Sequence, residues 1–136
     1  MTAKEYLSQA KQLDDAVNKL LKDRDYWRDL SKKVSGSNFE EHFNSNRSAE
    51  APFVRCLEKI AEIECDINSR IDVLVDLRTK INKAIDALEG LEEQIVLRCR
   101  YLDSYSWEKT ARSMGVSIRT AHRIHGRALK HFSIPE

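Results

Sequence analysis

The side chains best able to do chemistry in this sequence are basic and lie near its C-terminus. Between Trp107 and His131 there are six Lys or Arg residues and one acidic residue. Residues three and four positions apart share a helix face, so the spacing predicts a single cationic face made of Arg119, His122, Arg123, Arg127 and Lys130. Guanidinium and ammonium groups donate hydrogen bonds to phosphate oxygens and to guanine edges. The pattern therefore predicts noncovalent binding of double-stranded DNA.

Two short helices joined by a tight turn would hold this face in position. Ser106 is a good N-cap for a helix over residues 107–114, and Ser117 is a good N-cap for one over about residues 118–132. Gly115 is expected to end the first helix with a positive φ, which glycine adopts without steric cost. The arrangement predicted is a helix-turn-helix.

Helices that cross at such a turn need small side chains where they approach, and Ala111 and Ala121 occupy those places. His125 is also expected to face the core. The predicted inner face of the second helix comprises Ile118, Ala121, Ile124, Ala128 and Phe132.

Position along the helix predicts a role for each DNA-facing residue. The first turn of a recognition helix usually enters the major groove deepest, so Arg119 and Arg123 are the best candidates for guanine contact. Thr120 and His122 are further candidates. Phosphate contacts are expected at the remaining predicted positions, which are Arg127, Lys130, Lys109 and the N–H groups at the Ser117 end.

The stretch from Trp107 to Ala121 resembles region 4 of bacterial sigma factors, the part that binds the promoter −35 element. Arg100-Tyr101-Leu102, in an expected helix over residues 91–102, resembles the helix that precedes it in that family. Long N-terminal helices followed by this module are similar to the ArpU-type regulators of phages and prophages. The resemblance implies DNA contact by the last helix, and it leaves contact with host RNA polymerase open.

Two features depart from that family. A complete sigma factor also has an aromatic and basic region that binds the −10 element, and no such segment is present, which favours an accessory regulator. His125 and Gly126 stand where the family often has a leucine and a charged residue. Gly126 is expected to weaken its helix by roughly 1 kcal/mol relative to alanine.

The preceding residues show the 3.5-residue apolar repeat of a coiled coil. It runs over residues 3–34 and again over residues 53–89, with a linker rich in Ser, Asn and Glu at residues 35–52. Two such helices predict an antiparallel hairpin. The fold class expected is all-α, with a long coiled-coil hairpin in residues 1–90 and a helix-turn-helix domain in residues 91–136.

Charged residues within the apolar repeat are expected to set the register of this hairpin. A slip of seven residues leaves apolar packing unchanged but separates charged partners, and Arg24 is expected to pair with Glu64. Ile85 and Leu88 would then remain available to dock the C-terminal part or a second subunit. Pro52 is expected in the first turn of the second helix, and Gly90 is expected to cap its end.

Charge and composition restrict the possible partners. From Leu91 onward eight Lys or Arg residues stand against five acidic residues, in a chain whose net charge is +1. The three cysteines are widely spaced and are expected to be reduced and half-buried. No apolar run approaches the roughly 20 residues that span a bilayer, and no signal peptide is expected from the first residues. A cytoplasmic protein without a membrane partner is expected.

The sequence predicts no enzyme, no metal and no cofactor. His122, His125 and His131 do not all share one helix face, and no cysteine or acidic residue joins them. Glycine-rich phosphate loops, nucleophile–base pairs and the His-Glu-x-x-His motif are missing from the sequence.

Two other classes of function stay open. A small terminase-like subunit of a phage packaging assembly also joins helices to a DNA-recognition module, and assembly into a ring would favour it. A protein-binding scaffold would be favoured by loss of all DNA binding even at ~50 mM salt. For a regulator, a homodimer is expected because the seams are long and a single helix-turn-helix binds weakly.

Overall fold

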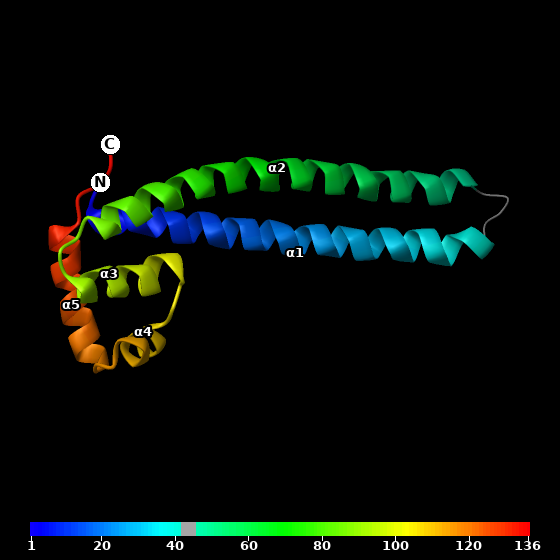
Figure 1. Ribbon diagram of the computed structural model, residues 1–136. Helices are drawn as coiled ribbons and strands as arrows, with labels where there is room; N and C mark the ends of the chain where they lie inside the picture. The colour runs from blue at the N-terminus through cyan, green and yellow to red at the C-terminus, as the bar shows by residue number, and fades with distance from the viewer. Residues whose placement is uncertain (42–45) are drawn as a thin grey trace. The chain divides into compact units, whose positions relative to one another are not determined.

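The computed structural model describes residues 1–41 and 46–136, and the side chains of residues 1–34 and 51–136. The described residues form helices and no strand, which confirms the all-α prediction. No helix among them is long and apolar enough to cross a membrane. Figure 1 shows the elements, which are α1 (Ala3–Glu41), α2 (Asn46–Asp86), α3 (Leu91–Leu97), the π-helical η1 (Arg98–Leu102), α4 (Trp107–Met114) and α5 (Ile118–His131).

The chain forms two compact units, each containing one stretch of α1 and one of α2. The first, here named the terminal unit, consists of Met1–Asp14 and Val73–Glu136. The second, named the middle unit, is Asp15–Asp72. These units divide the chain differently from the predicted domains, residues 1–90 and 91–136, and that domain division stays a prediction.

Within the middle unit, α1 and α2 lie side by side and run in opposite directions (Figure 1). Val17 and Ser31 of α1 are buried, as are Cys56 and Ile67 of α2. Few helices of this length are stable alone in water, because most helix stability comes from packing an apolar face. Burial of facing side chains therefore accounts for the pairing.

The predicted ion pair between Arg24 and Glu64, which was expected to set the register, is wrong in its arginine. Arg28, not Arg24, pairs with Glu64, and its Nη2 lies 2.7 Å from Oε1. Arg24 lies one helical turn earlier, with its Nη2 3.6 Å from the carboxylate of Asp25. Residues four apart share a face, so a helical repeat alone does not distinguish these two arginines.

Most of the predicted apolar seam is confirmed. None of its members on α1 is exposed. On α2, Leu57 and Ile71 are exposed, whereas Cys56 is buried and Arg70 is half-buried. A straight α-helix drifts about 20° per heptad from a 3.5-residue repeat, so the packed face of α2 shifts by one residue at these positions. The coiled-coil supertwist itself stays a prediction.

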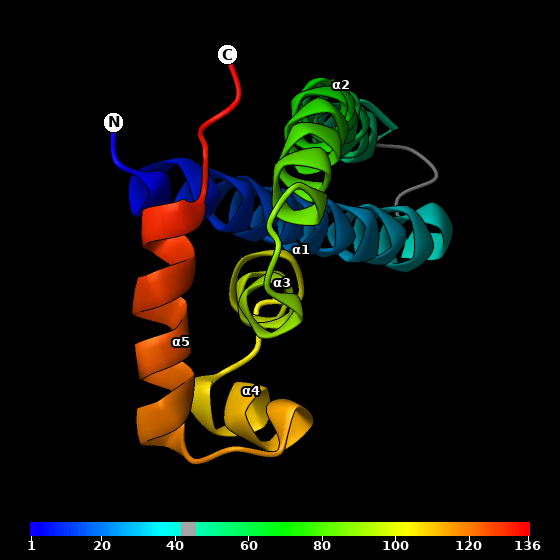
Figure 2. The same ribbon diagram turned by 60° about the vertical axis from the view of Figure 1, so that its left-hand side comes forward.

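The core of the terminal unit joins the beginning of α1 and the end of α2 to the C-terminal helices. Ile85 and Leu88 are buried in it, which confirms that they dock the C-terminal part. Both α3 and α4 pack against α5 (Figure 2). The buried members of this core are Tyr6, Leu7, Ala10, Ile81, Ile85, Leu88, Val96, Leu97, Tyr101, Leu102, Ile124, Ala128 and Phe132.

The helices enter the segment that was predicted as a linker over residues 35–52. α1 continues to Glu41 and α2 begins at Asn46, so Pro52 lies inside α2 and not in its first turn. Extending an existing helix is far easier than nucleating one, and the weak propensities of Ser and Asn did not stop it. Residues 42–45 of the predicted linker lie outside the described residues.

Gly90 does not cap the end of α2, which stops at Asp86. Instead it is the N-cap of α3, with an extended backbone at φ −81° and ψ 122°. Extended backbone is the usual conformation of an N-cap residue. A side chain here would be crowded, because a Cβ on Gly90 would lie 3.3 Å from Cγ and Cδ of Glu93.

All three cysteines are free. Cys56 and Cys99 are buried and Cys65 is exposed, so none of them matches the half-buried environment that was predicted. Burial, and then the negative charge of Asp103, raises the pKa of the Cys99 thiol. This thiol is therefore a poor nucleophile at neutral pH.

Candidate nucleic-acid interface

Two capped helices and a tight turn carry the predicted interface. Ser106 Oγ accepts a hydrogen bond from the backbone N–H of Lys109 at 3.2 Å, and Ser117 Oγ accepts one from that of Thr120 at 3.1 Å. Gly115 ends α4 in the left-handed region, at φ 69° and ψ 31°. These local predictions are confirmed, because each N-cap satisfies a backbone donor that its helix leaves unpaired.

Small side chains lie where α4 and α5 meet, as predicted. Ala111 and Ala121 are almost fully buried. The backbone N–H of Val116 donates to the carbonyl of Ala111 at 3.0 Å, which satisfies one of the last carbonyls of α4. The structure thus contains the angled helix pair of a helix-turn-helix (Figure 2).

The inner face of α5 is confirmed at every predicted position except its first. Ala121, Ile124, Ala128 and Phe132 are buried. Ile118 is 44% exposed, so its assignment to the core is wrong. It lies at the very start of α5, before the buried crossing point at Ala121.

His125 faces the core and is held by a tyrosine from η1. Its Nε2 lies 2.7 Å from the hydroxyl of Tyr101. Burial, followed by the positive charges of Arg100, Lys4 and His122, lowers the pKa of His125 from 6.5 to about 4. The imidazole is therefore neutral at neutral pH and serves the fold, because it points away from the outer face.

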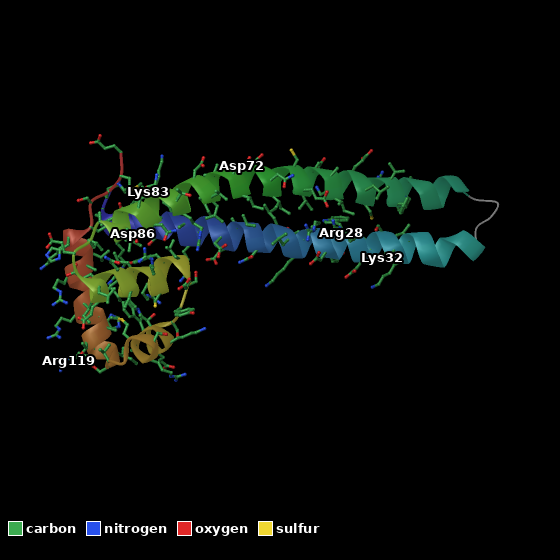
Figure 3. All side chains as sticks on the ribbon, in the orientation of Figure 1. Arg28, Lys32, Asp72, Lys83, Asp86 and Arg119 are labelled. Carbon is green, nitrogen blue, oxygen red and sulfur yellow. The ribbon has the colours of Figure 1, made fainter. Side chains whose placement is uncertain are left out.

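The outer face of α5 is cationic and exposed. Arg119, His122, Arg123 and Lys130 are all exposed, and α5 contains no acidic residue. Figure 3 shows Arg119 pointing away from the helices that pack against α5. Within the described part of the chain, the side chains of Arg119, Arg123 and Lys130 form no hydrogen bond or ion pair, so their donors are available to a ligand.

Ser117 and Thr120 are placed differently from these cations. The hydroxyl of Ser117 donates to Oγ1 of Thr120 at 2.9 Å, and Thr120 is half-buried. Both hydroxyls therefore contribute to the N-cap of α5, and a DNA contact by either residue stays a prediction.

His122 is fixed by an aromatic stack that the sequence did not indicate. Its ring lies on Trp107 of α4, with centroids 3.8 Å apart and planes inclined by 29°. The guanidinium of Arg100 also lies on Trp107, 4.3 Å from the centroid of the ring. Trp107 thus positions an exposed imidazole beside the first turn of α5.

Two of the predicted phosphate contacts have partners within the protein. The ammonium of Lys109 lies 4.1 Å from the ring centroid of Tyr105, a cation–π distance. Arg127 Nε lies 3.1 Å from Oε1 of Glu93. Both side chains are exposed, but each must leave its partner to bind phosphate.

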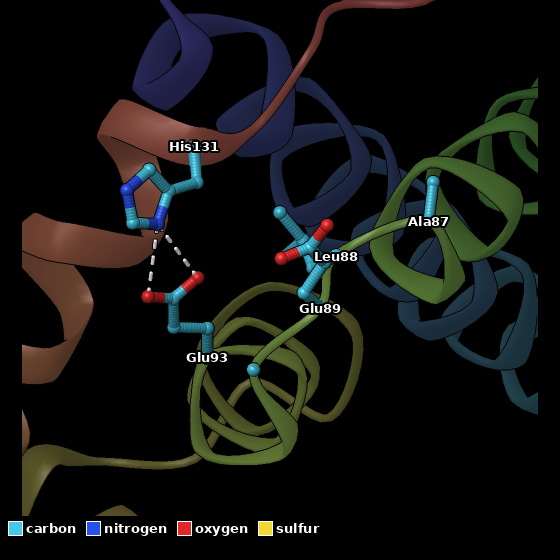
Figure 4. Close-up of a pocket in the computed structure, with 6 residues that line it drawn as sticks. Ala87, Leu88, Glu89, Glu93 and His131 are labelled. Carbon is cyan, nitrogen blue, oxygen red and sulfur yellow. Dashed lines mark hydrogen bonds and ion pairs between the residues drawn. The ribbon is translucent and has the colours of Figure 1, made fainter.

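Glu93 is the residue that sequence reasoning missed most clearly. Its buried carboxylate lies 3.0 Å from Nδ1 of His131 through both oxygens, in addition to its contact with Arg127. Figure 4 shows Glu93 and His131 in a pocket of about 450 Å³, next to Ala87, Leu88 and Glu89. No local signal marks Glu93, because its partners lie on a helix far along the chain.

The described residues contain no group of three or more His, Cys, Asp or Glu side chains that could hold a metal ion. His131 is engaged with Glu93, while His125 is bonded to Tyr101. His131 therefore has a different partner from His122 and His125, which both lie against the ring of Trp107.

Comparison with known families supports the helix-turn-helix. Residues 84–132 match the family model described as Sigma-70, region 4. This segment is a sigma region 4-like helix-turn-helix. The match confirms the resemblance inferred from Trp107 to Ala121, and it supports DNA binding by this module. Comparisons with curated proteins and with solved structures gave no match.

Proposed function

We propose that this chain is a transcriptional regulator of the type encoded by phages and prophages, and that it binds the major groove of double-stranded DNA through α5. The observation that carries the proposal is the exposed outer face of α5, which has basic side chains and no acidic one. A helix with its side chains is about 10–12 Å wide and fits a groove of about 12 Å.

Arg119 and Arg123 are the residues proposed to contact bases. They lie in the first half of α5, and an arginine can donate two hydrogen bonds to O6 and N7 of guanine. His122, held by Trp107, lies between them in sequence and adds a third polar contact. Lys130, near the end of the helix, is assigned to phosphate.

The proposal also covers the partners of the regulator. Long N-terminal helices before such a module resemble the phage regulators, and on that resemblance we propose an accessory role beside RNA polymerase and a homodimeric state. No catalytic step is part of the proposed function. Retention of purified RNA polymerase by the tagged chain, and sedimentation velocity, test the two partners separately.

Selection of duplexes from a random pool at about 50 mM salt tests the proposal, with footprinting of the selected site. Enrichment of one short motif that the chain protects is the expected result. Enrichment no better than that obtained with an Arg119→Ala, Arg123→Ala double variant would overturn the proposal. Assembly into rings on the selected DNA would favour a packaging subunit instead.

A further inference from the structure

Ile118 is an exposed apolar residue in the first turn of α5. Its side chain is 44% exposed, although the sequence pattern predicted that it would be buried. Arg119 follows it directly, and His122 lies one helical turn further along; both are exposed. Single exposed apolar residues are common on proteins, so the place of Ile118 matters more than its exposure.

We infer that Ile118 contacts the 5-methyl group of a thymine in the major groove and is a specificity-determining residue of the DNA site. This inference rests on the proposed function. The edges that base pairs present in the major groove are mostly hydrogen-bond donors and acceptors, and thymine alone adds a methyl group. An apolar side chain beside Arg119 and His122 is suited to that group.

The local structure restricts the positions that the Ile118 side chain can take. The N-cap bond between Ser117 Oγ and the backbone N–H of Thr120, at 3.1 Å, fixes the first turn of α5. A β-branched side chain has one strongly preferred χ1 rotamer in a helix. Contact with a methyl group would therefore cost little conformational entropy, which favours a defined contact over a loose one.

The charges around Ile118 favour DNA over an apolar protein partner. Arg119 and Arg123 are exposed, form no ion pair within the described residues, and lie on a helix without acidic residues. An apolar partner surface would have to remove these guanidinium groups from water without pairing them, which is costly. A duplex offers phosphates and base acceptors to the arginines and a methyl group to Ile118.

Deoxyuridine provides a direct test, because it differs from thymidine only by the missing methyl group. A duplex selected by the wild-type chain is remade with each thymine replaced in turn by deoxyuridine, and dissociation constants are measured by fluorescence anisotropy. For the wild type, one replacement should weaken binding roughly fourfold, the value for one buried methylene-sized group. For Ile118→Ala, the same replacement of thymine by deoxyuridine should leave the dissociation constant unchanged. For Ile118→Val, it should weaken binding by an intermediate factor.

Leu91→Ala is the matched control. Leu91 is the first residue of α3 and is 69% exposed, so the truncation is similar but lies outside α5. This variant should show the same fourfold ratio of dissociation constants between the deoxyuridine and thymine duplexes as the wild type. Circular dichroism verifies the helix content of each variant, and Ile118→Val decides the test if Ile118→Ala unfolds.

Two results would overturn the inference while wild-type DNA binding stays intact. One is a wild-type chain that is insensitive to every thymine replacement. The other is an Ile118→Ala variant that retains the whole fourfold loss. Failure of the wild-type chain to bind any selected duplex would instead overturn the proposed function, and with it this contact.

Discussion

The carboxylate of Glu93 binds the guanidinium of Arg127, with Oε1 3.1 Å from Nε. Glu93 is buried in the terminal unit, whereas about half of the Arg127 side chain is exposed. The same carboxylate lies 3.0 Å from His131. Glu93 thus compensates the charge of Arg127, whereas Arg119, Arg123 and Lys130 have no ion-pair partner among the described residues.

Glu93→Gln should strengthen DNA binding at low salt by releasing Arg127. Each additional phosphate neutralised steepens the dependence of log K on log salt by about 0.9, and anisotropy titrations over a salt series measure this slope. Glu92→Gln is the control, because Glu92 is exposed and 3.6 Å from Arg127; it should change the slope less. An unchanged slope in Glu93→Gln would contradict the release of Arg127 to a phosphate.

Alanine at the two glycines of the helix-turn-helix should have opposite effects on stability. A Cβ at either Gly115 or Gly126 would meet nothing within 4 Å, so the backbone alone decides the outcome. Gly115→Ala places a side chain at φ 69° and should destabilise by about 1–2 kcal/mol. Gly126→Ala, inside α5, should stabilise by about 1 kcal/mol. Urea unfolding measures both, and effects of the same sign would contradict the conformation assigned to Gly115.

Stability should fall as the pH drops below about 6.5 because of His125. Its pKa is lowered from 6.5 to about 4 in the folded chain. As the pH falls, the unfolded chain therefore binds a proton at a higher pH than the folded chain does. The contribution of neutral His125 to the free energy of unfolding is complete above pH 6.5 and is lost progressively down to pH 4. Between pH 7 and pH 5 the loss should be roughly 2 kcal/mol in urea unfolding.

Two histidine variants identify the source of this pH dependence. His125→Gln removes the titrating group and should reduce the difference in the free energy of unfolding between pH 7 and pH 5. His122→Gln removes only the last-named of the causes that lower the pKa of His125, so it should leave most of the stability difference in place. Equal pH dependence in His125→Gln and the wild type would exclude His125 as the cause.

Arg28 and Glu64 should show measurable coupling in a double-mutant cycle, and Arg24 with Glu64 should not. The Arg28 pair is about half exposed on both sides, so the coupling energy should be only about 0.2–1 kcal/mol. Thermal unfolding of the wild type, the two single alanine variants and the double variant gives the coupling energy of each cycle. Coupling that appears with Arg24 alone would restore the register first predicted from the sequence.

The helix-turn-helix could be predicted from the sequence because its signals are local. Ser106, Gly115 and Ser117 each determine the backbone within one turn of themselves, and all three behave as expected. Ala111 and Ala121 add a requirement for space that depends on this turn alone. Neighbouring residues therefore contained nearly all the information needed.

Long-range pairing could not be predicted in the same way. Glu93 meets Arg127 only because α3 packs against α5, and many carboxylates in the sequence have the same local pattern. The choice between Arg24 and Arg28 depends on the stagger of two helices, which a repeat defines only to within a turn. Ile118 was misplaced because helical periodicity does not show where a neighbouring helix begins to cover a face.

The dissociation constants of Arg119→Ala and Arg123→Ala for the selected duplex test the central claim most directly. If α5 lies in the major groove, each variant should bind its site about 1–3 kcal/mol more weakly than the wild type, with less discrimination against a scrambled duplex. Arg70→Ala, which removes a half-buried arginine of the middle unit that pairs with Asp66, should bind normally. Normal binding by both Arg119→Ala and Arg123→Ala would contradict the assignment of α5 as the DNA-contacting helix.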